Sequence, residues 1–120
     1  MQKSFKQLKV WQKSVALVTQ VYKDTDSLPK KEIYSLASQI RRSAISIPSN
    51  IAEGYKRKNI GEYIHFLHIA EASAAELETQ LIIMSNIYPD IDTEDSQLSL
   101  EEVQKMLFVL IKKLDKDTSL

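Results

Sequence analysis

Residues 60–87, IGEYIHFLHIAEASAAELETQLIIMSNI, decide the fold class of this chain. Apolar side chains recur there at alternating steps of three and four residues, the spacing that holds one helical face against a partner. They are Tyr63, Leu67, Ala70, Ala74, Leu77, Leu81 and Met84. Asn59 followed by Glu62 has the pattern of a helix-capping pair. The sequence therefore predicts a long helix over 60–87, and few strongly polar positions on its remaining surface predict burial on several sides.

The preceding stretch repeats the same spacing and predicts a second helix over 30–57. Its apolar positions are Ile33, Ala37, Ile40, Ala44, Ile47 and Ile51. Pro29 suits the first turn of such a helix, because a proline there forfeits no helical hydrogen bond. The apolar phase continues past Pro48, so we expect a kinked but continuous helix. Gly54 and the basic run that follows it are expected to end this helix.

Two shorter patterns flank this pair. The N-terminal stretch predicts a helix over about 6–25, with a core face at Leu8, Trp11, Val15, Val18 and Tyr22. An acidic connection over 86–97 is followed by Ser99 and Glu102, a second capping pattern, which predicts a last helix over 99–115. The sequence thus predicts one all-α domain of four helices over residues 1–120.

The second and third helices carry more apolar and small side chains than the core of one small bundle can bury. This surplus predicts self-association into a homo-oligomer. The candidate residues for a subunit or helix interface are Tyr34, Ile45, Ser46, Pro48, Asn50, Ala52, Glu53, Phe66, Ile69 and Ser73.

Composition narrows the functional classes. The 120 residues include two Gly and no Cys, which excludes disulfides and thiolate metal sites. No stretch approaches the roughly 20 apolar residues of a membrane span, and no signal peptide is evident, so we expect a cytoplasmic protein without membrane contact. Formal net charge is zero, yet residues 1–58 hold twelve Lys and Arg against four acids and residues 59–120 hold the reverse. Such asymmetry indicates either an interaction surface or attraction between helices within the fold.

Residue types that support catalysis or metal binding are sparse. Glu62 and His65 have the Glu-x-x-His spacing of di-iron bundles, but those sites require a second such pair, which the chain lacks. Neither His65 nor His68 has a Ser or Thr that periodicity would place beside it for nucleophilic catalysis. The sequence therefore predicts no enzymatic activity, no metal site and no cofactor.

Nucleic-acid binding has better support. Basic residues occur at helical spacing near the N-terminus and in two short runs, so they could track phosphates. The candidates are Lys6, Lys9, Lys13, Arg41, Arg42, Lys56, Arg57 and Lys58. The alternative is that these lysines form ordinary solvated faces, since the chain as a whole is not basic. Oligomerisation would favour binding by gathering one basic patch from each subunit.

Three stretches carry a family resemblance: LKVWQKSV at 8–15, QIRRSAISIPSNIAEGYKRK at 39–58 and FLHIAEASAAELETQL at 66–81. They resemble the four-helix-bundle proteins of the 23S rRNA intervening-sequence family, bacterial relatives of the accessory variability proteins of diversity-generating retroelements. The resemblance implies an up-and-down four-helix bundle that assembles as a ring-like homopentamer, without catalytic activity. It also implies that Arg41, Arg42, Ser46, Asn50 and Glu53 hold helices and subunits together, with Arg42 and Glu53 on one outer side of the second helix.

The retroelement relatives bind nucleic acid and a reverse transcriptase through a basic outer surface. We therefore expect a non-enzymatic oligomeric bundle that binds RNA or DNA through a basic surface, or that acts as a scaffold for another protein. The alternative is a structural oligomer that contacts only protein and no nucleic acid.

Overall fold

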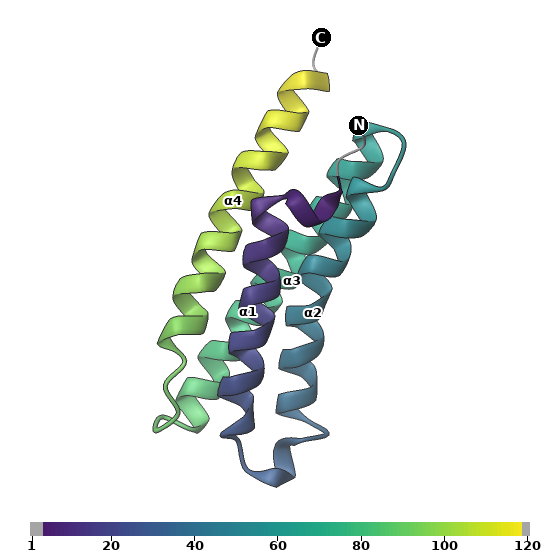
Figure 1. Cartoon of the computed structure of the whole chain (residues 1–120). Helices are drawn as coiled ribbons and strands as arrows, with labels where there is room; N and C mark the ends of the chain where they lie inside the picture. The colour runs from purple at the N-terminus through teal and green to yellow at the C-terminus, as the bar shows by residue number, and fades with distance from the viewer. Residues whose placement is uncertain (1–3, 119–120) are drawn as a thin grey trace.

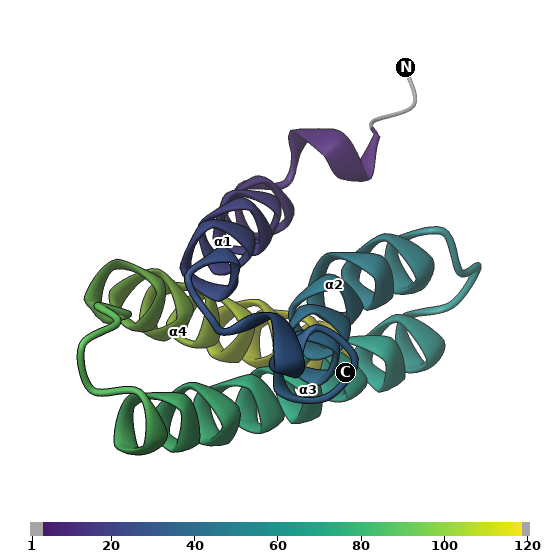
Figure 2. The same cartoon turned by 90° about the horizontal axis from the view of Figure 1, so that it is seen from below.

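Four α-helices run alternately up and down in the computed structural model, which describes residues 4–118 (Figure 1). They are α1 (Lys9–Asp26), α2 (Leu36–Tyr55), α3 (Ile60–Ile87) and α4 (Glu94–Thr118). Two short 3-10 helices, η1 (Phe5–Gln7) and η2 (Lys30–Glu32), precede α1 and α2, and the described range contains no strand. Each helix packs against the next along the chain, and α1 also packs against α4, as the end-on view in Figure 2 shows. The chain is therefore an all-helical bundle.

The periodic stripes of α2 and α3 form the centre of the core. Every stripe residue of α3 from Leu67 to Met84 is buried, and so are those of α2 from Ala37 to Ile51. Asn59 caps α3 as the sequence predicts: its side-chain oxygen accepts from the Glu62 amide at 2.8 Å, and its amide donates to the Glu62 carboxylate at 2.7 Å. The helical period therefore identified these buried positions correctly. Ile33, predicted as the first position of the α2 stripe, is wrong, because it lies before α2 and is exposed. The expected burial of α3 on several sides is not seen in the single chain, where Ile82 and Ile83 are exposed.

The predicted core face of α1 is shifted in phase, although Leu8, Trp11 and Val18 do pack against the edge of the core. Val15 and Tyr22 are exposed, whereas Val10, Ser14, Leu17 and Val21 are buried. Ser14 hides the true pattern because it is a polar residue in the middle of the buried face. Its hydroxyl donates to the Trp11 carbonyl at 2.8 Å, so burial leaves no polar group without a partner.

The start of the second helix also differs from the expected residue 30. Pro29 has extended backbone and precedes η2, a turn follows over 33–35, and α2 begins only at Leu36. Glu32 stabilises this alternative, because its carboxylate accepts from the hydroxyls of Ser35 at 2.6 Å and Tyr88 at 2.5 Å. Pro48 lies inside α2 without ending it, as predicted.

The last helix begins five residues before the expected position 99. Asp92 accepts from the Glu94 amide at 2.9 Å at its start, and Ser99 is an ordinary residue of the second turn rather than a cap. The early start is favoured by burial of Ser96, whose hydroxyl donates to the Asp24 carboxylate of α1. A tertiary contact thus sets the boundary of this helix.

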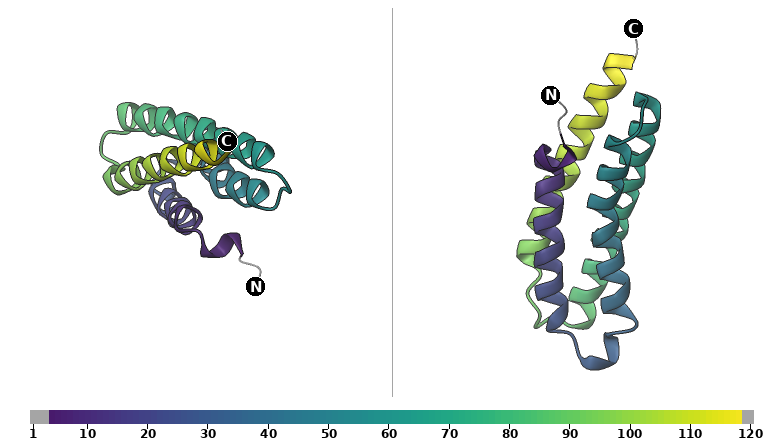
Figure 3. Two further views of the ribbon diagram at one scale, coloured as in Figure 1. Left: turned by 90° about the horizontal axis from the view of Figure 1, so that it is seen from above. Right: turned by 45° about the vertical axis from the view of Figure 1, so that its right-hand side comes forward.

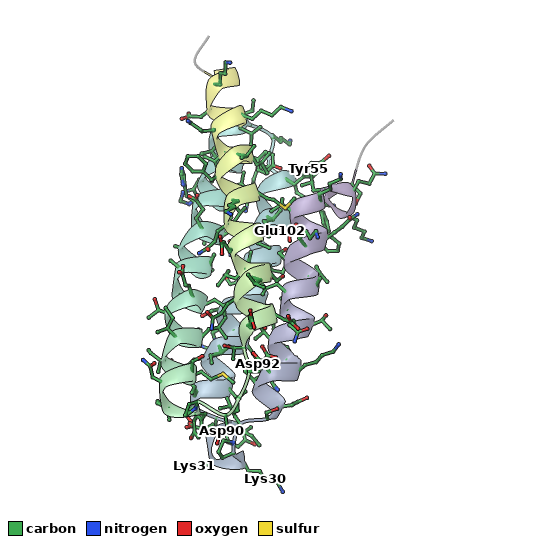
Figure 4. All side chains as sticks on the ribbon, turned by 90° about the vertical axis from the view of Figure 1, so that its left-hand side faces the viewer. Lys30, Lys31, Tyr55, Asp90, Asp92 and Glu102 are labelled. Atoms are coloured by element: carbon green, nitrogen blue, oxygen red, sulfur yellow. The ribbon has the colours of Figure 1, made fainter. Side chains whose placement is uncertain are left out.

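The up-and-down order sorts the connections to two ends of the molecule. One end carries η1, the α2–α3 connection over 56–59 and the C-terminal turns of α4 (Figures 1 and 3). The other end, called the far end below, carries η2 and the α3–α4 connection over 88–93. Figure 4 shows Lys30, Lys31 and Asp90 at the far end and Tyr55 near the opposite one. No helix in the described part is long and apolar enough to cross a membrane.

Candidate nucleic-acid interface

Four predicted lysines meet at the end of the bundle that carries η1. Lys6 lies in η1, Lys9 opens α1, Lys56 follows the last residue of α2, and Lys58 lies in the connection to α3. All four side chains are exposed, and within residues 4–118 none of them takes part in an ion pair. We call these four residues the basic end.

Aromatic packing holds the N-terminal part of the basic end in place. The ring of Phe5 packs edge-on against Trp11 with 5.3 Å between centroids, and the Lys56 ammonium lies 5.9 Å from the centre of the Phe5 ring. The Gln12 side chain donates to the Lys6 carbonyl at 2.8 Å. These contacts join η1 to α1 and to the end of α2, so Lys56 lies beside the segment that carries Lys6, 50 residues earlier in the sequence.

The C-terminal turns of α4 add three lysines that the sequence analysis does not name as candidates. Lys112, Lys113 and Lys116 are exposed residues of these turns, which lie at the same end of the bundle (Figure 3). An up-and-down order places the end of the fourth helix beside the start of the first. Topology, rather than any local motif, is the signal that identifies them.

Lys13 and Arg57 lie next to the basic end but have acidic partners. Lys13 pairs with Glu102 of α4 at 3.2 Å, and Arg57 pairs with Glu53 at 2.7 Å while lying over the Phe66 ring. Both pairs are about half exposed, and exposed pairs of this kind contribute little to stability. A phosphate could therefore displace either carboxylate at small cost.

Arg41 and Arg42 lie nearer the far end, away from the basic end. The Arg41 guanidinium donates to the Thr25 hydroxyl and the Asp26 carboxylate, both at 2.8 Å, and stacks 4.3 Å above the Tyr22 ring. Arg41 therefore anchors α2 to the last turn of α1. Arg42 is exposed and lines a hollow of about 460 Å³.

Several of the interface candidates join α2 to α3 within one chain. The hydroxyls of Ser46 and Ser73 are 2.8 Å apart, and the Asn50 amide donates to the Ser46 carbonyl at 2.8 Å. Pro48 is buried, whereas four further candidates are half-buried or, at Glu53, exposed. These four are Ala52, Glu53, Phe66 and Ile69. Glu53 pairs with Arg57 rather than with Arg42, and its side chain is 55% exposed, so this pair is not a buried one.

Gly54 contributes to the α2–α3 interface in a way that the sequence reading missed. Expected to stop the helix, it instead lies within α2 and does not have a positive φ. A β-carbon at this position would lie 2.8 Å from the Phe66 β-carbon and 3.1 Å from the Tyr63 carbonyl. Gly54 therefore permits close approach of the two helices.

Tyr34 and Ile45 are the candidates that remain open to solvent. Tyr34 is 95% exposed in the turn before α2, and Ile45 is 42% exposed. Both line the hollow that Arg42 also lines, together with Tyr22 and Ile33. Tyrosine, arginine and isoleucine side chains exposed together are typical of a protein interface.

Tyr63, His65 and His68 of α3 make local contacts. Burial, and to a smaller extent the neighbouring Tyr55, raises the pKa of Tyr63 to about 12. His68 contacts Glu71 at 2.9 Å on the surface, and the His65 ring packs against Phe66. Across the part of the chain that the structure describes, no three His, Asp or Glu side chains converge as metal ligands would.

Comparison with known proteins identifies a family. A family model described as 23S rRNA-intervening sequence protein matches residues 6–112, which include parts or all of the four helices. The comparison with curated proteins gives no match.

Proposed function

The chain belongs to the 23S rRNA-intervening sequence protein family, and from this premise we propose that it is a non-enzymatic homo-oligomer that binds RNA or DNA through its basic end. The observation that carries the proposal is the meeting of Lys6, Lys9, Lys56 and Lys58 at one end without acidic partners in the described range. Exposed ammonium groups that are not neutralised within the protein favour phosphates, because binding releases the counterions of the nucleic acid.

Self-association belongs to the same proposal. The exposed Tyr34 and Ile45 support it, because a nearly bare tyrosine beside aliphatic residues gains most by being covered. The form we expect is the ring-like homopentamer implied by the resemblance, in a bacterial cytoplasm. In a ring, each subunit would present its basic end on the same face, and several weak phosphate contacts would add up. A relation to retroelement accessory proteins would extend this role to scaffolding a protein partner.

The test is a fluorescence-anisotropy titration of a structured rRNA fragment and of duplex DNA at two salt concentrations. The variant Lys6→Gln/Lys56→Gln/Lys58→Gln should bind more weakly, and its log–log salt slope should be shallower by about 0.9 for each lost phosphate contact. The matched control is Lys23→Gln/Lys30→Gln/Lys31→Gln, which removes the same charge nearer the far end, where Figure 4 shows Lys30 and Lys31. The proposal fails if the parent binds neither ligand at low salt, or if both triple variants lose affinity equally.

A second candidate function is a purely protein-binding oligomer. The hollow that Tyr34, Ile45 and Arg42 line favours it, since exposed aromatic, apolar and arginine side chains together suit a protein partner as well as a phosphate. The same titration separates the two candidates. A protein-binding oligomer would keep its mass and show no salt-dependent binding to either nucleic acid.

A further inference from the structure

A groove of about 390 Å³ lies between the start of α1 and the second half of α4, and Figure 4 shows these two helices side by side. We call it the α1–α4 groove. Its apolar lining comprises Leu8, Val10, Met106, Val109 and Leu110. Val10 is buried and Leu8, Met106 and Leu110 are half-buried, so these four form the floor, whereas Val109 is 63% exposed at the rim. A concave apolar surface of this kind is stabilised when an apolar ligand covers it.

Three lysines supply the charge in the lining of the α1–α4 groove. They are Lys9 of α1 and Lys105 and Lys113 of α4. Among the side chains that the structure describes, Lys9 and Lys113 pair with no acid, and Lys105 has an exposed pair with Glu101 at 3.1 Å. An apolar groove with a cationic rim suits a ligand that is apolar along most of its length and anionic at one end.

A second hollow that also involves α4 has a rim of the opposite sign. This hollow, of about 280 Å³ between α3 and α4, is lined by Glu78, Glu94 and Glu101. It contains the exposed apolar residues Ile82 and Leu98 as well. Because both hollows offer apolar surface, the charge of a ligand decides which of them it enters. An anionic ligand is attracted to the α1–α4 groove and repelled by the other hollow.

We propose that the α1–α4 groove binds a free single-chain carboxylate amphiphile, of the chemical class of the fatty acids. Its alkyl chain lies along Met106, Val109 and Leu110 and leaves water there, and its carboxylate pairs with the ammonium groups that have no acidic partner, those of Lys9 and Lys113. A membrane is a poorer occupant, because it requires an apolar face that projects into the bilayer, whereas most of this lining is sunk between two helices.

The α1–α4 groove is separate from the surface that supports self-association. That surface includes Tyr34 and Ile45, which line a hollow over α1 and α2. A ligand between α1 and α4 therefore leaves a ring of subunits, and the direction of their basic ends, as they are. The site shares Lys9 with the basic end, but the inference goes beyond the proposed function and does not rest on it.

Isothermal titration calorimetry with octanoate, decanoate and dodecanoate, each below its micelle concentration, tests the chemistry of the ligand. Each added methylene should lower the dissociation constant by up to about fourfold, so dodecanoate should bind about tenfold more tightly than decanoate. Dodecylammonium is the head-group control and should bind at least about tenfold more weakly than dodecanoate. Absence of dodecanoate binding, an affinity independent of chain length, or equal binding of the two head groups overturns the proposal.

Two neighbouring substitutions on α4 test the place of binding. Val109→Glu puts a carboxylate at the rim of the groove and should weaken dodecanoate binding at least about tenfold. The matched control is Phe108→Glu, which adds the same charge at a residue that is 57% exposed and outside the groove lining, and it should change the dissociation constant less than about twofold. Circular dichroism checks that both variants are folded. Equal losses in the two variants would place the ligand elsewhere and overturn the proposal.

The lysines are tested in the same titration. Lys9→Gln/Lys113→Gln should weaken dodecanoate binding about tenfold and remove most of its dependence on salt. The matched control is Lys23→Gln/Lys30→Gln, two exposed lysines that do not line the groove. Equal losses in the two double variants would show that net charge, rather than the rim of the groove, attracts the carboxylate, and the proposal would fail.

Two further measurements test other occupants of the groove. In sedimentation velocity Val109→Glu should keep the mass of the parent; a smaller mass would show that a second copy covers the groove and would overturn the proposal. The parent should not co-sediment with phosphatidylcholine–phosphatidylglycerol vesicles; co-sedimentation that Val109→Glu abolishes would assign the groove to a membrane instead. If dodecanoate does not bind while salt-dependent binding of nucleic acid persists, this inference alone is lost and the proposed function stands.

Discussion

The α2–α3 interface and the basic end use the same stretch of sequence in opposite ways. Within 39–58, Ser46 and Gly54 face α3, and Asn50 donates to the Ser46 carbonyl within α2. Lys56 and Lys58, directly after them, turn to solvent and have no ion-pair partner in the described range. The residues of this stretch that pack within the chain therefore specify the fold. Lys56 and Lys58, which follow them, supply positive charge that a ligand can bind.

A recognisable stretch of sequence can therefore contain residues that set helix packing and residues that supply charge to a binding partner. Small residues at a helix interface specify a backbone separation, so any larger side chain is felt by the whole bundle. Exposed lysines supply positive charge at one position on the surface, and their loss lowers the affinity for a negatively charged partner. Mutations in the two regions should therefore affect different measurements, and this can be tested from the largest expected effect to the smallest.

The largest effect is expected at Gly54. The substitution Gly54→Val should lower the free energy of unfolding by about 2–3 kcal/mol, because overpacking a close helix contact costs more than valine's small gain in helix propensity. The reason is geometric: the new β-carbon would lie 2.8 Å from the Phe66 β-carbon, so α2 and α3 must separate. Urea denaturation followed by circular dichroism measures the change.

The matched control for Gly54 is Gly61→Val. A β-carbon at Gly61 meets only the side-chain oxygen of Asn59, at 3.5 Å, so this variant should change the free energy of unfolding by less than about 0.5 kcal/mol. Equal losses at the two glycines would show that close approach of the helices is not what Gly54 provides.

A smaller loss is expected at the paired hydroxyls of α2 and α3. Ser46→Ala and Ser73→Ala should each cost about 1 kcal/mol, the net worth of a partly buried hydrogen bond. The double variant should cost less than the sum, because the two substitutions remove the same hydrogen bond. Ser49→Ala, exposed on the same helix, is the control and should be nearly neutral. Additive losses in this double-mutant cycle would contradict a direct contact.

Features of the fold that depend on local sequence could be predicted, whereas those that depend on contacts between distant residues could not. The α2 and α3 stripes were predictable because helical period is a local property, and so was the Asn59 cap. The starts of α2 and α4 were not, because Tyr88 binds Glu32 from 56 residues away and Asp24 binds Ser96 from 72. At both helix starts, a tertiary hydrogen bond outweighs the local pattern. The face of α1 was mispredicted for a local reason, because the buried Ser14 hydroxyl donates within its own helix to the Trp11 carbonyl.

The candidate site was predictable only in part, and for the same reason. The lysines of 6–9 and 56–58 were visible as charge clusters, but their meeting depends on η1 packing across the end of α2. Lys112, Lys113 and Lys116 join them only once the helix order is known. Arg41 shows the converse, since its sequence context suggests a phosphate ligand while its guanidinium is occupied by α1.

The basic end should contribute almost nothing to stability. The triple variant Lys6→Gln/Lys56→Gln/Lys58→Gln should change the free energy of unfolding by less than about 0.5 kcal/mol, because the lysines make no ion pair within residues 4–118. The urea denaturation used for Gly54 measures this as well. A loss of more than about 1 kcal/mol would mean that these lysines belong to the fold, and the contrast between the two regions would disappear.

The smallest effect is expected at the far end, at Glu32. Hydrogen bonds from Ser35 and, less strongly, Tyr88 hold the pKa of the Glu32 carboxyl below its ordinary 4.5. A lowered pKa means that the charged form is favoured by folding, so the contribution is present above the ordinary pKa and disappears as pH falls through the lowered one. Ser35→Ala should therefore raise the pKa of Glu32 more than Tyr88→Phe does, as measured by NMR titration of the carboxyl carbon. Because these contacts lie at the far end, outside the core, neither substitution should unfold the bundle, and an unchanged Glu32 pKa in Ser35→Ala would show that the hydroxyl does not stabilise the carboxylate.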